Sequence, residues 1–279
     1  MYKIYSLIYF LLLSSFSTQI ACEETTPDNT ITIFVHGTFP ARKILHQTSF
    51  KPLIYAPDGL SLAKNLPENY FFHTIAQECA KLNTQRYSLD QFYIFGWESE
   101  HVYNTVRMQA AQNLVCELQD LVNNYYIKHN IIPKIQLIGF SHGGNVVLNT
   151  ANYLPLILNN KKINVNVWLF GTPVQLVNQE LINNKNFNKV YSIYSKKDWL
   201  QKMDPQGLMY LKHQKNTFWS DRTFNKKDSC IQVDFTVNNQ SIAHSYYRYI
   251  FKHIPIIQNL IEKESQDIDS GMIAINLEI

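Results

Sequence analysis

The sequence has little net charge and no repeats. Its 25 basic and 22 acidic residues leave a formal charge of +3, an excess too small to indicate a nucleic-acid partner. No internal repeat or long low-complexity segment occurs. Hydrophobic residues make up 46% of the chain and charged residues 17%, a balance typical of a globular protein.

Cysteine is scarce. Apart from Cys22, the chain has only Cys79, Cys116 and Cys230. These three cysteines cannot all pair with one another, and so few cysteines cannot form a disulfide framework. We therefore expect buried thiols with at most one bridge. The sequence also has no metal-ligand constellation and no phosphate-binding glycine loop, so we expect no metal and no cofactor.

The apolar run near the N-terminus, Ile4 to Leu13, is too short to span a bilayer. A basic residue precedes it and small polar residues follow, which is the layout of a secretory signal. We predict that residues 1–21 are a signal peptide and that the protein is exported. Cys22 would follow the cleavage site, as the lipid-carrying cysteine does in bacterial lipoproteins, although Gln19 stands where such signals usually have an aliphatic residue. A buried first helix is the alternative.

Short apolar runs alternate with helical patterns along the rest of the chain. The runs are nearly continuous in hydrophobicity, which indicates strands covered on both faces. Between them, apolar residues recur at helical spacing from Val106 to Tyr125, and again after Ser141 until Pro155. This order predicts parallel strands with right-handed crossovers. The predicted strands are residues 30–37, 91–97, 134–140, 164–171, 189–195 and 230–237.

We therefore predict an α/β fold: an open, mostly parallel sheet of about six strands with helices on both faces, in a single domain over residues 22–279. Residues 39–70 and 199–229 fit neither the strand nor the helix pattern. Irregular segments of that length in a compact domain are usually functional or mobile, so we expect them to resemble lids.

Residues 139–143 read GFSHG and lie between a predicted strand and a predicted helix. In an open α/β sheet, ligands bind outside the carboxyl ends of the strands. A serine at the tip of so tight a turn takes a strained backbone conformation, and flanking glycines avoid collisions there. The motif alone is common by chance, but this setting predicts that Ser141 is an exposed nucleophile. An ordinary glycine-rich turn is the alternative.

The chain resembles the α/β-hydrolase superfamily, and within it the lipase-like and esterase-like serine hydrolases. The resemblance runs from Thr30 to about Leu260. It rests on FVHGTF, FGWESEHVYNTVR, GFSHGGN, LFGTPV and YSIYSKKDWL, followed by IAHSYY. It implies the α/β-hydrolase fold and a catalytic triad in the chain order serine, acid, histidine. It also implies the substrate, a carboxylic ester and in particular a lipid or acyl ester, about which the spacing of the triad says nothing.

A serine hydroxyl needs a base within hydrogen-bond reach to act as a nucleophile at neutral pH. The base should come from the loop beyond the last strand, where His244 lies. His253 lies further on, inside a predicted terminal helix, and His213 precedes the last strand. His244 is therefore the predicted catalytic base.

The acid should follow the predicted strand that ends at residue 195. Asp198 is the first carboxylate after it, and Asp204 is the alternative six residues further on. The acid would hold the imidazole in one tautomer and stabilise the imidazolium.

The negative charge that develops on the substrate carbonyl oxygen needs preorganised donors. We predict an oxyanion hole formed by the backbone N–H groups of His142 and Thr38, with the Thr38 hydroxyl as a candidate third donor. His36 is expected to be a structural hydrogen-bonding residue. Trp97, Glu98 and Ser99 follow another strand end and are candidates to line the cleft, and we expect a buried ion pair for Arg107.

The leading hypothesis is thus an exported serine hydrolase acting on a small-molecule or lipid ester, with association to a membrane or lipid surface compatible with it. The same residues suit a thioesterase, an amidase or an acyltransferase. A non-catalytic surface binding protein that kept the fold is a second hypothesis. An intracellular carbon–carbon or peptide hydrolase with a mistaken signal is a third. The acyl chain length and the oligomeric state are not encoded in any motif.

Overall fold

The computed structural model describes residues 28–39, 47–101, 103–205, 219–225 and 230–279. The predicted signal peptide, Cys22, His213 and parts of the two irregular segments lie outside these residues. Within the described ranges, no helix is both long and apolar enough to cross a membrane.

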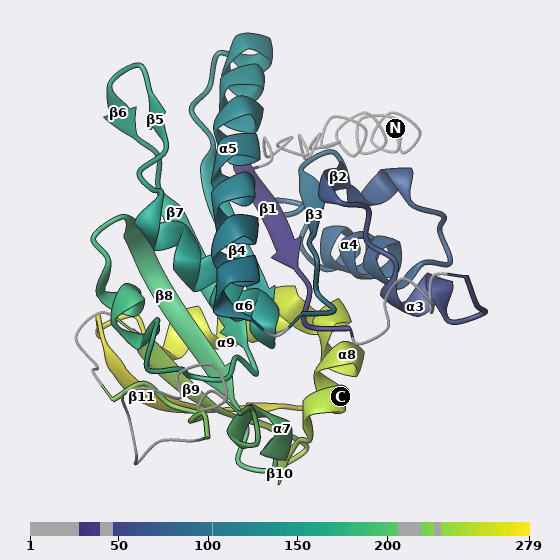
Figure 1. The fold of residues 1–279 in the computed structure, drawn as a ribbon, viewed down its shortest axis with the longest axis vertical. Coiled ribbons are helices and arrows are strands. Elements are labelled where there is room, and N and C mark those ends of the chain that lie inside the picture. Colours follow the sequence, from purple (N-terminus) through teal and green to yellow (C-terminus); the bar gives the residue numbers. More distant parts are fainter. Residues whose placement is uncertain (1–27, 40–46, 102, 206–218, 226–229) are drawn as a thin grey trace, which may run out of the picture.

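A large twisted sheet forms the middle of the molecule (Figure 1). Its nine strands are β1 (Thr30–Val35), β2 (Gly59–Leu62), β3 (Phe92–Gly96), β4 (Lys134–Phe140), β7 (Val165–Phe170), β8 (Phe187–Tyr194), β9 (Ile231–Val237), β10 (Gln240–Ser241) and β11 (Gly271–Leu277). They follow the order β10-β9-β8-β7-β4-β1-β3-β2, and β11 also pairs with β9. All pairs are parallel except β2 with β3 and β9 with β10. A separate hairpin consists of β5 (Ile157–Leu158) and β6 (Lys161–Lys162).

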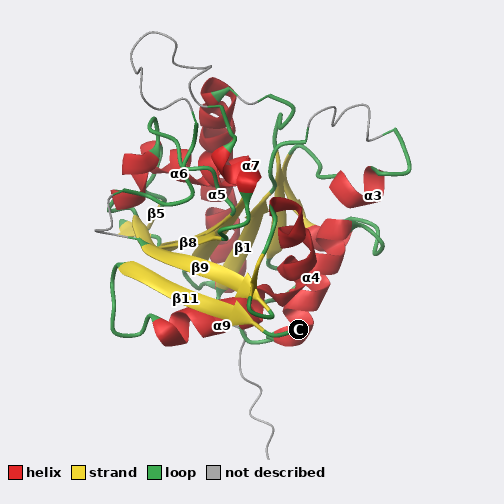
Figure 2. Cartoon of the chain, turned by 90° about the horizontal axis from the view of Figure 1, so that it is seen from below, coloured by secondary structure: helices red, strands yellow, loops and turns green. Residues whose placement is uncertain are grey.

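Helices cover both faces of the sheet. They are α3 (Lys51–Ile54), α4 (Phe71–Leu82), α5 (Asn104–His129), α6 (His142–Asn149), α7 (Trp199–Lys202), α8 (Tyr247–Ile250) and α9 (Ile254–Glu264). Apolar residues of α5 and α6 pack in one hydrophobic core, and those of α4, α8 and α9 pack in the other. Figure 2 shows these groups on opposite sides of the sheet. The central strands are consequently buried on both faces, as their continuous hydrophobicity predicts.

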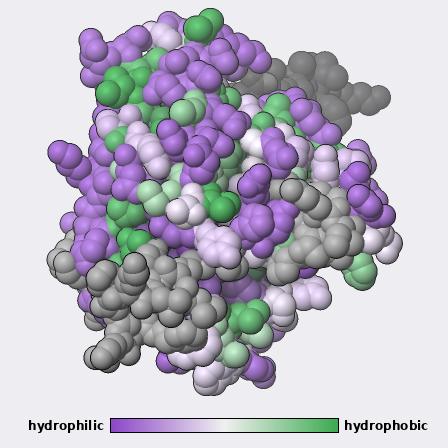
Figure 3. Space-filling view, in the orientation of Figure 1, coloured by the Kyte–Doolittle hydropathy of each residue, from purple (hydrophilic) through white to green (hydrophobic). Residues whose placement is uncertain are grey.

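Local sequence explains where two of the helices begin and end. The long helix α5 ends at His129 and is capped by Asn130, whose φ of 54° is left-handed; asparagine tolerates that conformation better than most residues. Helix α9 has Pro255 in its first turn, where the missing N–H costs nothing. Seen from the α5 side, the surface is mainly hydrophilic with scattered hydrophobic residues (Figure 3).

The strand order creates a point where ligands are expected to bind. The chain runs from β1 through α4 to β3 on one side, and then through α5 to β4 on the other side of β1. The carboxyl ends of β1 and β4 are neighbours, with Val35 opposite Gly139. In an open α/β sheet such a switch in direction leaves a crevice at the carboxyl ends. The turn that contains Ser141 lies directly beyond it.

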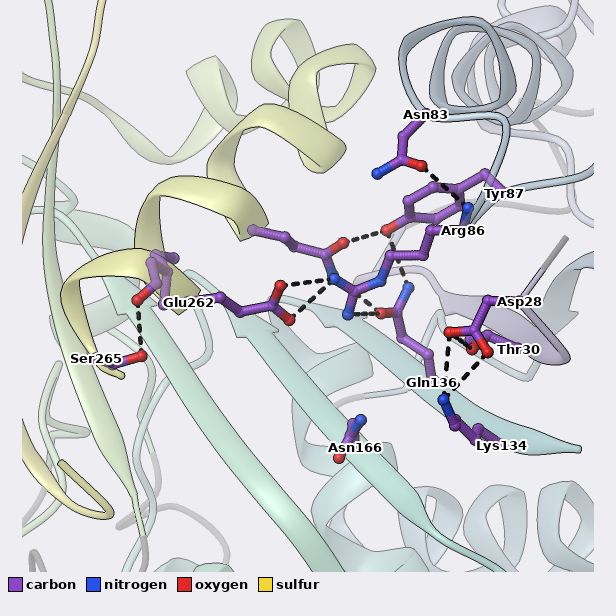
Figure 4. Close-up of polar contacts among 12 residues, drawn as sticks. Asp28, Thr30, Asn83, Arg86, Tyr87, Lys134, Gln136, Asn166, Glu262 and Ser265 are labelled. Atoms are coloured by element: carbon purple, nitrogen blue, oxygen red, sulfur yellow. Dashed lines mark hydrogen bonds and ion pairs between the residues drawn. The ribbon is translucent and has the colours of Figure 1, made fainter. Parts of the chain in front are cut away.

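A cluster of polar side chains lies at the opposite, amino end of the same strands (Figure 4). Nη1 of Arg86 contacts both carboxylate oxygens of Glu262 at 2.9 Å, and Nη2 donates to Gln136 at 2.8 Å. The hydroxyl of Tyr87 accepts from Gln136 at 3.0 Å and contacts Gln258. These five residues are the amino-end cluster.

All six predicted strands are present, but the sheet has nine strands rather than about six. The additional ones are β2, β10 and β11. Each is an edge strand or a short hairpin partner, and β11 alternates between exposed and less exposed positions instead of forming a continuous apolar run. Residues 39–70 contain α3 and β2, so this segment is more regular than we expected.

The expectation for the cysteines was wrong in one respect. Cys79, Cys116 and Cys230 are all free, and Cys116 is exposed on α5, whereas the other two are buried.

Candidate active site

The turn after β4 holds Ser141 in an unusual backbone conformation, with φ 53° and ψ −130°. A positive φ is uncommon for a residue with a side chain, and such strain persists only where the surroundings enforce it. The N–H of Ser141 donates to the Phe170 carbonyl at 2.9 Å, and the Ser141 carbonyl accepts from the N–H of Gly144 at 2.9 Å. Helix α6 begins at the next residue. The serine is therefore fixed at the tip of a strand-to-helix turn.

Two glycines allow this turn to approach the end of β1. A Cβ on Gly143 would lie 2.2 Å from the Val35 carbonyl oxygen, which is a severe clash. A Cβ on Gly37 would lie 2.9 Å from the Cβ of Ser141. The loop that follows β1 thus lies directly against the candidate nucleophile, and only glycine fits at the contact.

Asp198 and His244 meet at the carboxyl end of the sheet. Oδ2 of Asp198 lies 2.8 Å from Nδ1 of His244. The carboxylate is completely buried and the imidazole is 13% exposed. Asp198 also caps α7, because its Oδ1 accepts from the N–H of Gln201 at 3.0 Å. With one oxygen used by the helix, the other accepts the Nδ1 proton, which leaves Nε2 of His244 as the basic nitrogen.

The His244 ring lies beside the nucleophile turn. It stacks on Phe140, the residue before Ser141, with 4.9 Å between ring centroids and 23° between planes. Gly171, directly after the strand next to β4, would bring a Cβ to 3.1 Å from Oδ2 of Asp198 and 3.3 Å from Nδ1 of His244. The structure therefore brings His244 and Asp198, which follow β10 and β8, close to the turn after β4 that holds Ser141.

The alternative acid and bases lie elsewhere or outside the described residues. Oδ1 of Asp204 contacts Nε2 of His142 at 2.9 Å rather than His244. His253 ends a short 3₁₀ turn, Phe251–His253, before α9.

Two predicted oxyanion donors flank Ser141. His142 is the first residue of α6, and the Ser141 side chain makes no cap to that helix, so its N–H is among those that a helix leaves without an internal acceptor. Thr38 follows Gly37 on the other side. Its hydroxyl is buried and has no hydrogen-bond partner among the described residues. By contrast, the N–H of Phe39 donates to the Ser99 carbonyl at 3.2 Å.

The other residues singled out in the sequence have structural surroundings. His36 is buried and its Nδ1 lies 2.8 Å from the Gly37 carbonyl oxygen, as expected of a structural residue. Trp97 donates from Nε1 to the His36 carbonyl at 2.9 Å. Trp97 and Glu98 line a cavity of about 530 Å³ beside α5, whereas Ser99 is fully buried.

A closed set of hydrogen bonds that no sequence motif indicated lies next to the turn of Ser141. Nη1 of Arg107 lies 2.9 Å from Nδ1 of His142, and Nε2 of that imidazole lies 2.9 Å from Oδ1 of Asp204. Gln175 closes the set: its Nε2 donates to Oδ2 of Asp204 at 2.5 Å, and its Oε1 accepts from Nη2 of Arg107 at 2.8 Å. All four side chains are buried. We call them the carboxyl-end ring.

Burial and hydrogen bonding shift the pKa values inside the ring. Burial lowers the pKa of His142, and the Arg107 guanidinium adds to that effect, although the hydrogen bond to Asp204 opposes it. For Asp204, burial alone would raise the pKa. The hydrogen bond and the electrostatic attraction from His142, with hydrogen bonds from Ser220 and Gln175, outweigh burial and lower the pKa to about 2. The ring therefore combines a neutral imidazole with an ionised carboxylate.

Large apolar side chains are exposed directly after Asp198. Trp199 and Leu200 of α7 and Met203, which follows it, are 58–64% exposed. Among the described residues, no group of three or more His, Cys, Asp or Glu side chains could hold a metal ion.

No protein-family profile matches the chain, and no curated protein matches it. Among solved structures, a lipase-esterase related protein from Clostridium acetobutylicum is 14% identical, covers 90% of this chain and 86% of its own, and gives a TM-score of 0.28. Esterase B from Lactobacillus rhamnosis is 8% identical, with 92% of this chain and 66% of its own covered and a TM-score of 0.31. At these TM-scores the likeness carries no argument for an activity. The mixed α/β architecture with its mostly parallel sheet is compatible with an α/β-hydrolase fold, and the chemistry has to be argued from the site.

Proposed function

We propose that this protein is a serine hydrolase of the α/β-hydrolase superfamily that cleaves carboxylic esters, with lipid or acyl esters as its substrates. One observation carries the proposal. A buried carboxylate, Asp198, hydrogen-bonds an imidazole, His244, that stacks against the residue preceding a serine with a strained backbone. Strained serines at strand-to-helix turns and carboxylate-oriented imidazoles are the parts that acyl transfer requires.

The reaction follows from the roles of these groups. Nε2 of His244 takes the proton of the Ser141 hydroxyl as its oxygen attacks the ester carbonyl carbon. The tetrahedral intermediate collapses, the C–O bond to the alcohol breaks, and His244 returns the proton to the leaving alcohol. Water then attacks the acyl-enzyme with the same base and releases the acid. Asp198 keeps the Nδ1 proton in place and stabilises the imidazolium throughout.

The charge on the carbonyl oxygen would be held by the N–H groups of His142 and Thr38. The buried Thr38 hydroxyl, which has no partner among the described residues, supports a third donor at the same place. A buried hydroxyl without a hydrogen-bond partner is costly. If the Thr38 hydroxyl gains its acceptor only when the oxyanion forms, that hydrogen bond stabilises the transition state selectively.

A lipid surface is the proposed location of the substrate. Trp199, Leu200 and Met203 are exposed beside the acid, and the lysines Lys197 and Lys202 are exposed on the same segment. Aromatic and aliphatic side chains mixed with lysine suit the boundary between anionic headgroups and acyl chains. Export through residues 1–21 and lipidation of Cys22 fit this proposal and rest on the sequence alone.

The proposal is tested with a fluorophosphonate probe and a panel of substrates. We expect the probe to label the folded protein and not Ser141→Ala. The panel contains p-nitrophenyl esters of increasing chain length together with a phospholipid, a thioester and an amide, and we expect esters to be turned over fastest. Folded protein that is neither labelled nor active on any ester would contradict the proposal and favour a binding protein.

A further inference from the structure

The hydrogen bonds of the carboxyl-end ring allow only one assignment of protons. Arg107 can only donate, so Nδ1 of His142 must accept from it and the imidazole proton must be on Nε2. Asn145 also directs its Nδ2 at the same Nδ1, at 3.3 Å. The Nε2 proton is then donated to Asp204, which can only accept. The Gln175 amide presents its oxygen to Arg107 and its nitrogen to Asp204. Donors and acceptors thus alternate around the ring without a conflict.

The ring joins segments that are far apart in the sequence. Arg107 comes from α5, His142 from the first turn of α6, Gln175 from the loop after β7, and Asp204 from the residues after α7. That last segment begins at Asp198. The ring therefore links the nucleophile turn at one end with the acid segment at the other.

The backbone of His142 needs such support. Its helix has only eight residues and starts without a side-chain cap, directly after the strained Ser141. The N–H of His142 is the first of the helix and has no acceptor within it, so the first turn has to be held from the side. The His142 ring does this, since it is 6% exposed and bonded at both nitrogens.

We propose that Arg107, Asp204 and the imidazole of His142 are positioning residues, which hold the N–H of residue 142 where the oxyanion forms and lock it to the segment carrying Asp198. This inference rests on the proposed function for its catalytic consequence, but not for its structural one. In this role the ring side chains act through the backbone of residue 142 rather than on the substrate.

The chemistry of the ring defines a set of variants. In Asp204→Asn, the amide NH₂ meets a donor whichever way it turns, either His142 or Gln175. His142→Gln keeps one acceptor for Arg107 and one donor for Asp204, whereas His142→Leu keeps neither. Glu262→Gln in the amino-end cluster is the matched control. It likewise removes the charge of a carboxylate in a polar cluster, here one paired with Arg86. This cluster contacts β4 at Gln136, about 16 Å along the strand from Ser141.

Ester turnover is measured well below the midpoint of thermal unfolding, on protein shown to be folded by circular dichroism. We expect Asp204→Asn and His142→Leu to lower kcat about 10- to 100-fold with KM changed less than about 3-fold, because small misplacements of a transition-state donor act on the chemical step. His142→Gln should recover most of kcat, and Glu262→Gln should leave kcat unchanged. Equal kcat in Asp204→Asn and wild type, or equal loss in Glu262→Gln, overturns the proposal.

A second measurement does not depend on activity. In ¹⁵N-labelled protein, we expect the His142 imidazole to be neutral with its proton on Nε2. The backbone amide of residue 142 should exchange with solvent faster in Asp204→Asn than in wild type, and at the wild-type rate in Glu262→Gln. An unchanged exchange rate in Asp204→Asn overturns the positioning role. A changed exchange rate in a protein that turns over no ester supports the positioning role and removes the proposed function instead.

Discussion

The two ends of the sheet each contain a polar cluster, built from similar residues but buried to different extents. At the amino end, Arg86 and Glu262 contact each other directly, and Glu262 is 39% exposed. At the carboxyl end, Arg107 and Asp204 are both buried and are bridged by His142 and a glutamine.

The difference in burial between the two clusters indicates different roles. A direct and partly solvated pair adds local stability at little cost. Charges that are wholly buried are expensive to desolvate, so they are retained where a fixed geometry matters more than stability. The carboxyl-end ring lies behind the candidate nucleophile, and the amino-end cluster does not. We therefore expect changes at the carboxyl end to act on rate and changes at the amino end to act on stability.

The largest expected effect is at Ser141. Ser141→Ala removes the nucleophile and should lower turnover of a p-nitrophenyl ester by roughly 10³- to 10⁶-fold. His244→Ala should give a similar loss, because the hydroxyl is then left without a base. Unfolding midpoints close to wild type would show that the loss is chemical. A variant that retains more than a tenth of the wild-type rate would falsify the assignment of the nucleophile.

A smaller effect distinguishes the two aspartates. Asp198→Asn should lower kcat by roughly 10²- to 10⁴-fold, since the imidazole loses the group that fixes its tautomer. Asp204→Asn should cost less, because Asp204 acts through the backbone of residue 142. Steady-state kinetics give kcat for the two variants side by side and show which aspartate matters more for turnover. If Asp204→Asn is the slower enzyme, Asp204 and not Asp198 has the role of the acid.

The sequence predicted the parts of the site that follow strand ends. The central strands are apolar throughout, so their ends are visible in the sequence, and Ser141, Asp198 and His244 each come shortly after one. The turn glycines could also be recognised in the sequence, because a tight strand-to-helix turn needs residues without a side chain on both sides of its serine. Edge strand β11 was not predicted, since it is partly exposed and lacks a continuous apolar run.

The ring could not be predicted from the sequence. Its hydrogen bonds join residues 35, 62 and 68 positions apart, and no local pattern relates them. The one signal was Arg107 at an inward position of an amphipathic helix, for which we expected an ion pair. The structure bonds its guanidinium to the His142 imidazole and the Gln175 amide, two tertiary contacts that the helical pattern does not reveal.

At the amino end, Arg86→Met should lower stability without changing turnover. The substitution removes the pair with Glu262 and the contact of the guanidinium with the Trp168 ring, 5.8 Å from its centroid. We expect a loss of about 2 kcal/mol, or about 4–8 °C in the unfolding midpoint. Differential scanning calorimetry measures the midpoint, and kcat is determined at a temperature where both proteins are folded. A fall in kcat beyond about twofold would contradict the division of roles between the two ends.

The smallest effect is a pH dependence of stability at the carboxyl end. Because the pKa of His142 is lower in the folded protein than its ordinary value, the unfolded chain binds a proton first as the pH falls below about 6.5. The free energy of unfolding should therefore decrease toward acid, by at most about 1.4 kcal/mol per pH unit. His142→Gln should reduce this slope between pH 5 and 7.5, a window above the titration of Asp204, whose pKa is about 2.

Urea unfolding at several pH values measures that slope. His253 needs a control, since burial and the neighbouring Lys252 also lower its pKa. We expect His253→Gln to remove its own contribution and leave that of His142, so that the two variants together flatten the profile more than either alone. A wild-type slope that persists unchanged in His142→Gln would mean that the imidazole titrates normally in the folded protein. The neutral imidazole on which the donor–acceptor order of the ring depends would then be wrong.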